Sequence, residues 1–182
     1  MYRNKAFPSF SKVLAPGRRK DNFCYLLALL SAWLLLNWVG NAPDAVLRVL
    51  LYPHKRAAEL FYHTILYYRE GIGYQAWNSG YVIGRECMGY RFILLLYAMN
   101  ACTYVRHFTG FRKLLWISAS LAGAIPVGLF ASILRIIGSI PFVLHKNFPL
   151  IHLFIGTFLY LFVLIVDYAG LNKLFGRIRY EK

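Results

Sequence analysis

Long apolar stretches separated by short polar segments dominate the pattern along this chain. Four stretches are apolar enough to cross a hydrocarbon core, which takes about 20 helical residues. They are residues 23–41, 89–105, 114–137 and 150–171. The first follows a basic leader, residues 1–22, and has no small-residue cleavage site, so we expect it to remain as an anchor. The pattern predicts an all-α polytopic membrane protein of one domain, with about four transmembrane helices.

The segment between the first two spans, residues 42–86, has a mixed pattern. After Pro53, apolar residues at helical spacing predict an amphipathic helix on the membrane surface, although a connector packed on the bundle explains the pattern equally well. These residues are Ala57, Leu60, Phe61, Ile65 and Tyr68. Alternating residues on both sides of Asn78-Ser79-Gly80 predict a short β-hairpin just before Cys87. An extended edge there could hold a peptide by strand addition.

Composition supports the membrane assignment and argues against nucleic acid as a partner. Hydrophobic residues make up 59% of the 182 positions and charged residues only 15%, which is too apolar for an ordinary soluble domain. The net charge is +14, but the basic residues lie at the edges of the apolar stretches and form no single stripe. Cys24 and Cys102 fall inside predicted spans, where a cysteine usually acts as a small packed hydrophobe.

The distribution of basic residues predicts the orientation. Thirteen Lys and Arg side chains lie in the leader, in the loop after the second span and in the tail, residues 172–182, whereas six lie in the other connecting segments. Loops rich in Lys and Arg stay in the cytoplasm, so both termini are expected there.

This topology places three reactive residues, Cys87, Arg135 and His152, at span ends on the outer face. A thiolate is stabilised at a helix N-terminus and by a nearby arginine. A histidine just after Pro149, at a helix N-terminus, is biased toward the neutral form that a general base needs. Each residue also has an ordinary structural explanation, as a packed cysteine, an interfacial arginine or a hydrogen-bonded histidine. His145 is the reserve base, and the other histidines, His54, His63 and His107, are assigned roles in packing or hydrogen bonding.

Three short blocks of sequence carry a resemblance to a known family. They are Glu86-Cys87-Met88-Gly89, Ser132-Ile133-Leu134-Arg135-Ile136, and His152 followed by Gly156. Their order and their placement in successive spans resemble the signature of the exosortase/archaeosortase family, over roughly residues 74–167. Met88 stands where the family usually has a small hydroxyl residue, and Ser132 stands where many members have Asn.

The resemblance implies a membrane-embedded cysteine protease or transpeptidase in the plasma membrane of a prokaryote. Cys87 would attack a peptide carbonyl and form a thioester, His152 would move protons, and Arg135 would hold negative charge, with Ser132, Gly89 and Gly156 in support. Implied substrates are exported proteins with a C-terminal signal made of a motif, a transmembrane segment and a basic cluster, and the acceptor is unknown.

Two other classes of function remain open at the level of sequence. One is a non-enzymatic membrane scaffold or assembly factor in which the three residues form a structural polar cluster. The other is a small transporter or lipid-handling protein that binds an anion through Arg135 and His152. The sequence contains no motif for a metal ion or another cofactor, so none is expected.

Overall fold

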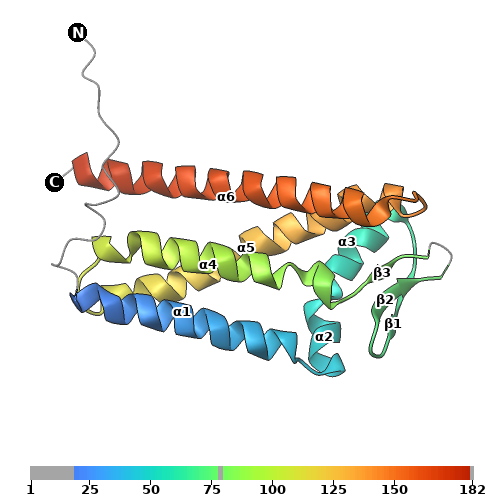
Figure 1. Ribbon diagram of the computed structural model, residues 1–182, viewed down its shortest axis with the longest axis horizontal. Coiled ribbons are helices and arrows are strands. Elements are labelled where there is room, and N and C mark those ends of the chain that lie inside the picture. The colour runs from blue at the N-terminus through green and yellow to red at the C-terminus, as the bar shows by residue number, and fades with distance from the viewer. Residues whose placement is uncertain (1–18, 78–79, 181–182) are drawn as a thin grey trace, which may run out of the picture.

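The computed structural model describes residues 19–77 and 80–180. Four helices run along its length: α1 (Arg19–Gly40), α4 (Tyr90–Tyr104), α5 (Arg112–Ser139) and α6 (Phe148–Tyr180) (Figure 1). In the described part of the chain, three helices are long and apolar enough to cross a membrane. Their apolar segments are Asn22–Gly40, Arg112–Phe142 and Phe148–Gly176. The mainly helical architecture is therefore as predicted, and it is compatible with a membrane protein.

The second predicted span is the exception. Residues 89–105 yield α4, which has 15 residues and is shorter than the about 20 that a hydrocarbon core takes. The structure therefore shows three rather than four helices of spanning length. α4 packs against α1, α5 and α6, and it runs lengthwise with them (Figure 1).

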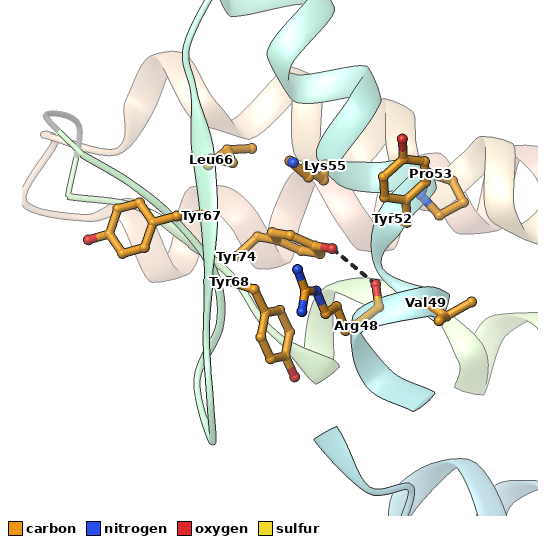
Figure 2. A pocket seen from close by; sticks show the side chains of 9 residues that line it. All are labelled: Arg48, Val49, Tyr52, Pro53, Lys55, Leu66, Tyr67, Tyr68 and Tyr74. Carbon is orange, nitrogen blue, oxygen red and sulfur yellow. Dashed lines mark hydrogen bonds between the residues drawn. The ribbon is translucent and has the colours of Figure 1, made fainter. Parts of the chain in front are cut away.

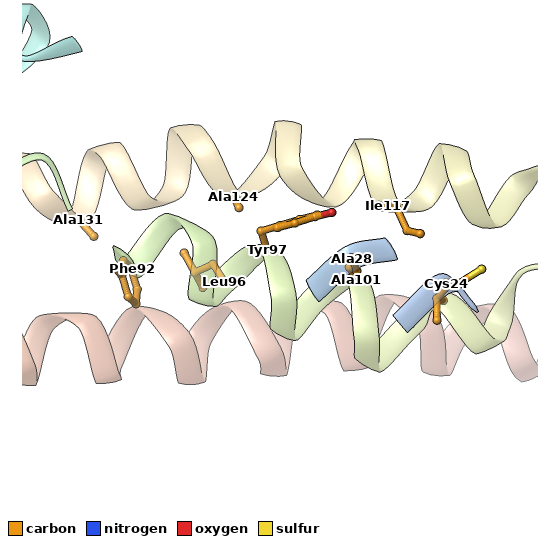
Figure 3. Close-up of a cluster of buried hydrophobic side chains, with 10 residues drawn as sticks. Cys24, Ala28, Phe92, Leu96, Tyr97, Ala101, Ile117, Ala124 and Ala131 are labelled. Atoms are coloured by element: carbon orange, nitrogen blue, oxygen red, sulfur yellow. The ribbon is translucent and has the colours of Figure 1, made fainter. Parts of the chain in front are cut away.

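The core of the bundle lies around α4. Phe92, Leu96 and Tyr97 are buried there against small residues of the neighbouring helices (Figure 3). Ala28 of α1 and Ala124 and Ala131 of α5 are each about 1% exposed or less. Small side chains let helix backbones approach closely, which is the common way of packing helices in a membrane.

Two short helices and a sheet cover one end of the bundle, which we call the sheet end (Figure 1). The helices are α2 (Asp44–Leu50) and α3 (Tyr52–Tyr62), and the strands are β1 (Leu66–Arg69), β2 (Gly73–Ala76) and β3 (Val82–Ile83). The sheet is antiparallel in the order β1-β2-β3. The start of α1 and the end of α6 lie at the opposite end.

The predicted hairpin is confirmed. Strands β2 and β3 pair with Tyr74 opposite Ile83, while the turn residues Asn78 and Ser79 lie outside the described residues. Strand β1 was not predicted. It occupies residues that had been assigned to the amphipathic helix, so the predicted extent of that helix was wrong. That helix ends at Tyr62, because His63 adopts a left-handed conformation with φ of 50°. Ile65 and Tyr68, which the helical spacing had included, lie beyond this end.

The remainder of the predicted amphipathic helix exists as α3. The side of α3 that faces the bundle is the one that carries its buried residues, His54 and Ala58. His54 and Ala58 lie one turn apart and are about 1% exposed or less, because this face of α3 packs on α5. Leu60 and Phe61 point away from the bundle and are 72% and 61% exposed. An exposed apolar face at this end is suited to a membrane interface.

Candidate active site

The sheet end brings together the three reactive residues from three different elements. Cys87 lies in η3 (Arg85–Met88), a short 3-10 turn that precedes α4. Arg135 lies one turn before the end of α5, and His152 lies in the first two turns of α6. The start of α4, the end of α5 and the start of α6 all lie at this end (Figure 1).

Arg135 and His152 are directly hydrogen-bonded. Arg135 Nε donates to His152 Nε2 at 3.1 Å, and Arg135 Nη2 lies 2.6 Å from the same nitrogen. A guanidinium group only donates, so Nε2 must present its lone pair. The imidazole proton is then on Nδ1, which donates to Ser139 Oγ at 2.8 Å. Ser139 Oγ in turn donates to the Arg135 carbonyl oxygen, which closes a ring around a neutral His152.

Tyr160 is a further member of this cluster that the sequence did not single out. Its hydroxyl oxygen accepts a hydrogen bond from Arg135 Nη1 at 3.1 Å, and the guanidinium carbon lies 5.5 Å from the ring centroid. The ring stacks on Phe92 of α4, with centroids 4.2 Å apart. The available signal was spacing, because His152, Gly156 and Tyr160 follow one another at intervals of four and share one face of α6.

Gly156 has a specific steric role between these two side chains. A Cβ at this position would lie 2.8 Å from Arg135 Cδ and 3.2 Å from Arg135 Nε. The absence of a side chain therefore lets Arg135 lie across α6 and reach both His152 and Tyr160.

Gly89 serves the turn that carries Cys87. Its φ is 65°, a left-handed conformation that favours glycine. A Cβ here would lie 2.6 Å from the Ser132 Cβ and 3.0 Å from the Tyr160 hydroxyl oxygen. The backbone just after Cys87 thus touches both α5 and α6, the two helices that carry Arg135 and His152.

Arg85 fixes the other side of the same turn. Its Nη2 donates to the Ala42 carbonyl oxygen at 2.7 Å, and its Nη1 donates to the Gly40 carbonyl oxygen. These carbonyls belong to the end of α1 and the residues after it, where a helix has unsatisfied acceptors. The turn with Cys87 is therefore attached to α1 as well as to α5 and α6.

Cys87 is half-buried, and this changes one expectation. Burial raises the pKa of the Cys87 thiol, and the carboxylate of Glu86 adds to the rise, while the Gly84 backbone and the positive charge of Arg135 oppose it. The sequence predicted a stabilised thiolate at a helix N-terminus. In the structure, Cys87 lies in η3, ahead of the first turn of α4, so burial outweighs the charge of Arg135.

The charge of Arg135 affects the pKa of the Cys87 thiol, but the thiol is not hydrogen-bonded to Arg135 or His152. Within residues 19–77 and 80–180, no hydrogen bond joins Cys87 Sγ to Arg135 or His152. Cys87 lines a cavity of about 600 Å³ with the start of α2 and the β1–β2 hairpin. Arg135 and Tyr160 line a neighbouring cavity of about 340 Å³, and Glu86 lines both.

Ser132 connects the cluster to a second histidine. His54 Nε2 lies 2.7 Å from Ser132 Oγ, which itself donates to the Leu129 carbonyl oxygen at 2.9 Å. The bond between His54 and Ser132 links α3 to α5, and its donor depends on the tautomer of His54. In the part of the chain that the structure describes, the buried Nδ1 of His54 has no hydrogen-bond partner of ordinary geometry.

Burial also decides the charge of His54. The residue is 1% exposed, and burial lowers its pKa to about 4, with a smaller contribution from the charge of Arg135 and partial opposition from the Leu50 backbone. His54 is thus neutral near pH 7. Its burial and its hydrogen bond to Ser132 agree with the role in packing or hydrogen bonding that the sequence suggested.

The described residues contain no group of three or more His, Cys, Asp or Glu side chains placed to hold a metal ion. Comparisons with family models, with curated protein sequences and with solved structures found no match to the chain.

Proposed function

We propose that the protein is a membrane-embedded cysteine protease or transpeptidase that cleaves C-terminal sorting signals of exported proteins, as the exosortase/archaeosortase resemblance implies. The observation that carries the proposal is the direct contact between Arg135 and His152 beside the turn of Cys87. Gly89, Ser132 and Gly156, the supporting residues that the resemblance implies, occupy contact points between the same elements.

The proposed topology has four crossings, with the sheet end on the outer face and both termini in the cytoplasm. α1 ends at the sheet end, whereas α5 begins at the opposite end (Figure 1). Between α1 and α5 the chain has to return from the sheet end to the opposite end, and α4 runs in this direction. The turns η3 and η4 (Val105–His107) extend α4 at its two ends, which supports a crossing despite its length.

The proposed reaction begins when the Cys87 thiol loses its proton to His152. The thiolate attacks the carbonyl carbon of the scissile peptide bond, and the carbonyl oxygen becomes an oxyanion. When this intermediate collapses, the C–N bond breaks, the leaving amine takes the proton from His152, and a thioester remains on Cys87. Water or an amine of the acceptor then breaks the C–S bond, which releases a carboxylic acid or a new amide and restores the thiol.

This chemistry requires a local rearrangement of Arg135. His152 Nε2 can take a proton only when the two N–H groups of Arg135 release its lone pair. The same N–H groups are then free to stabilise the thiolate or the oxyanion. A substrate that draws Arg135 toward developing negative charge would therefore activate the base in the same movement.

The test compares C-terminal processing in cells that express the wild type or Cys87→Ala. In the variant, proteins that end in a motif, an apolar span and a basic cluster should accumulate uncleaved. Cys102→Ala is the matched control, because Cys102 is a half-buried cysteine of α4, outside the turn. Unchanged C-termini in Cys87→Ala would contradict the proposal.

A non-enzymatic scaffold is the second candidate function, and one observation favours it. Arg135 and His152 satisfy their hydrogen bonds with each other, Ser139 and Tyr160, as a structural polar cluster would. Cys87→Ser separates the two candidates. A scaffold keeps its function with a hydroxyl at this position, whereas a thiol enzyme loses its activity.

A further inference from the structure

Two cavities away from Cys87 adjoin each other where α2 and α3 meet the bundle. The first is an apolar groove of about 340 Å³ between α1, α4 and α5. Its walls include Leu35, Trp38, Ile93, Leu94, Ile125 and Leu129. Trp38 and Ile125 are 57% and 48% exposed, so the groove is open between helices of spanning length.

The second is a cavity of about 620 Å³ lined by tyrosines, aliphatic side chains and two basic residues (Figure 2). Arg48 and Lys55 converge on an aromatic pair, Tyr68 and Tyr74, whose rings meet edge to face at 5.1 Å. The Arg48 guanidinium carbon lies 5.8 Å from the Tyr68 ring centroid, and Lys55 Nζ lies 5.4 Å from that of Tyr74. A cation near an aromatic face is favourable, but two like charges at one cavity repel each other.

Only one of these two cations has an acidic partner. Lys55 Nζ lies 3.5 Å from a Glu59 carboxylate oxygen, and Arg56 lies 3.6 Å from the other oxygen of the same group. Arg48 forms no ion pair with any carboxylate in residues 19–77 and 80–180, and it is exposed. The wall of the cavity holds two basic side chains and no acidic one, so the cavity suits an anion.

The two cavities adjoin each other. Val49 and Pro53 line both of them, so the cavity with Arg48 and Lys55 lies directly beside an apolar groove. We infer that together they bind one anionic phospholipid, with its phosphate at Arg48 and Lys55 and an acyl chain along the groove. The inference rests on the membrane location of the chain and is independent of the peptidase proposal.

The shape of the groove favours an acyl chain over a helix of another protein. A helix with side chains is about 10–12 Å in diameter, so a cavity of this volume holds less than about one turn. A single acyl chain is much thinner. The tyrosines of the second cavity also suit a lipid, since tyrosine is enriched where a membrane meets water.

Trp38 provides a direct test, because it lines the groove. The full-length protein is placed in lipid nanodiscs of phosphatidylcholine with a minor fraction of lipid brominated on its acyl chains, either phosphatidylglycerol or phosphatidylcholine. The Trp38 signal is the difference between the fluorescence of the wild type and of Trp38→Phe. At equal fractions, brominated phosphatidylglycerol should quench this signal about fivefold more effectively for each cation that contacts the phosphate.

Charge variants identify the source of this preference. Arg48→Gln and Lys55→Gln should each remove most of it, whereas Arg69→Gln, a change to an exposed cation at the end of β1, should retain it. Ile125→Phe narrows the groove at an exposed position and should reduce quenching by both brominated lipids. Each variant is first checked for a monodisperse size-exclusion profile.

Three results would overturn the inference. Equal quenching by the two brominated lipids would show that the chain binds no particular head group. A preference that survives in Arg48→Gln and Lys55→Gln would place the anion elsewhere. Unchanged quenching in Ile125→Phe would place the acyl chain outside the groove.

Discussion

Single residues set how closely the helices of the site approach one another. The clearest case is α6, where His152, Gly156 and Tyr160 occupy successive turns on one face. Arg135 lies across this face. It is hydrogen-bonded to His152 and Tyr160, one turn to either side of Gly156, and it contacts the glycine itself. The site therefore depends on the absence of a side chain at Gly156 as much as on its polar groups.

The change Gly156→Ala tests this contact. Because the new methyl group would lie 2.8 Å from Arg135 Cδ, Arg135 has to move away from His152. Overpacking of this kind costs about 1–3 kcal/mol, so we expect a lower thermal midpoint in detergent and a loss of C-terminal processing. Gly170→Ala is the control, since a Cβ there meets nothing within 4 Å and alanine favours a helix. Equal effects of the two changes would contradict the steric role of Gly156.

The second residue-scale prediction concerns the ionisation of Cys87. Burial raises the pKa of its thiol and the charge of Arg135 opposes the rise, so Arg135→Gln should raise the pKa further. Only the thiolate reacts with alkylating reagents. The alkylation rate should therefore fall at neutral pH, and its midpoint should move to higher pH. Rates measured from pH 6 to 10, roughly the range of cysteine ionisation, check this.

The control for this measurement is Arg91→Gln. Arg91 is an exposed cation that pairs with Glu86 at 3.7 Å. Its removal should leave the alkylation profile nearly unchanged. If the profiles of Arg135→Gln and the wild type coincide, the charge of Arg135 does not reach the thiol.

His54 gives the third residue-scale prediction, which concerns stability against pH. Its folded-state pKa is about 4, below the about 6.5 of an unfolded histidine. Between these values the unfolded state binds more protons, so stability is complete above pH 6.5 and falls as the pH drops to 4. The loss is at most about 3 kcal/mol.

The measurement is the thermal midpoint in detergent as a function of pH. In His54→Gln, whose amide can still donate to Ser132, the part of the pH dependence due to His54 should disappear between pH 6.5 and 4. His145→Gln, a change to an exposed histidine, should keep the wild-type slope. An identical slope in His54→Gln and the wild type would rule out His54 as the titrating group.

At the scale of elements, the sequence predicted what depends on local periodicity. The long apolar stretches became α1, α5 and α6, and alternation around residues 78–80 became the β2–β3 hairpin. The segment from Ile65 to Tyr68 was misassigned because its residues also fit helical spacing. Its actual conformation depends on pairing with β2, which involves Leu66 opposite Ala76 and which no local pattern reveals.

The same distinction applies to the candidate site. The location of Cys87, Arg135 and His152 at one end of the bundle was predictable, because residues near the ends of long apolar stretches are visible in a sequence. The contact of His54 with Ser132 joins residues 78 positions apart, and it depends on how α3 is rotated against α5. The resting state of Cys87 was not predictable either, because burial is a property of the packed turn.

The turn from η3 to α4 gives a prediction at the element scale. Gly89→Ala places a methyl group 2.6 Å from the Ser132 Cβ in a left-handed conformation, so the turn should move away from α5 and α6. We expect faster alkylation of Cys87 at a fixed pH, because its thiol becomes less buried, together with loss of processing.

Gly110→Ala is the matched control for this change. Gly110 also has a positive φ, 53°, but a Cβ there meets nothing within 4 Å. It therefore reproduces the backbone strain without the steric contact. If both variants expose Cys87 equally, strain rather than contact with Ser132 is responsible.

At the scale of the whole molecule, polar contacts gather at the two ends of an apolar bundle. The Arg135–His152 cluster lies at the sheet end, and Asn100 Nδ2 donates to Asp167 Oδ2 at 2.8 Å toward the other end. The buried core between them is mainly apolar, and the Tyr97 hydroxyl within it is hydrogen-bonded to Ser31 Oγ at 2.6 Å. This arrangement fits a protein whose middle section lies in hydrocarbon, since polar groups there need partners within the protein.

The last prediction addresses whether α4 is a fourth crossing. The loop between α4 and α5 and the loop between α5 and α6 lie at opposite ends of the bundle (Figure 1). If the sheet end is outside, Lys146→Cys should react with a membrane-impermeant maleimide in intact cells, whereas Thr109→Cys should react only after permeabilisation. Both positions are exposed.

The background carries Cys24→Ala, Cys87→Ala and Cys102→Ala, so the introduced thiol is the only one. Because α5 alone separates the two loops, a labelled tag at the N-terminus supplies the second reference. Two positions on the same side are separated by an even number of crossings. Since α1 is long and apolar enough to cross, protection of this tag together with Thr109→Cys indicates that α4 crosses as well, while labelling of Thr109→Cys in intact cells would refute the proposed topology.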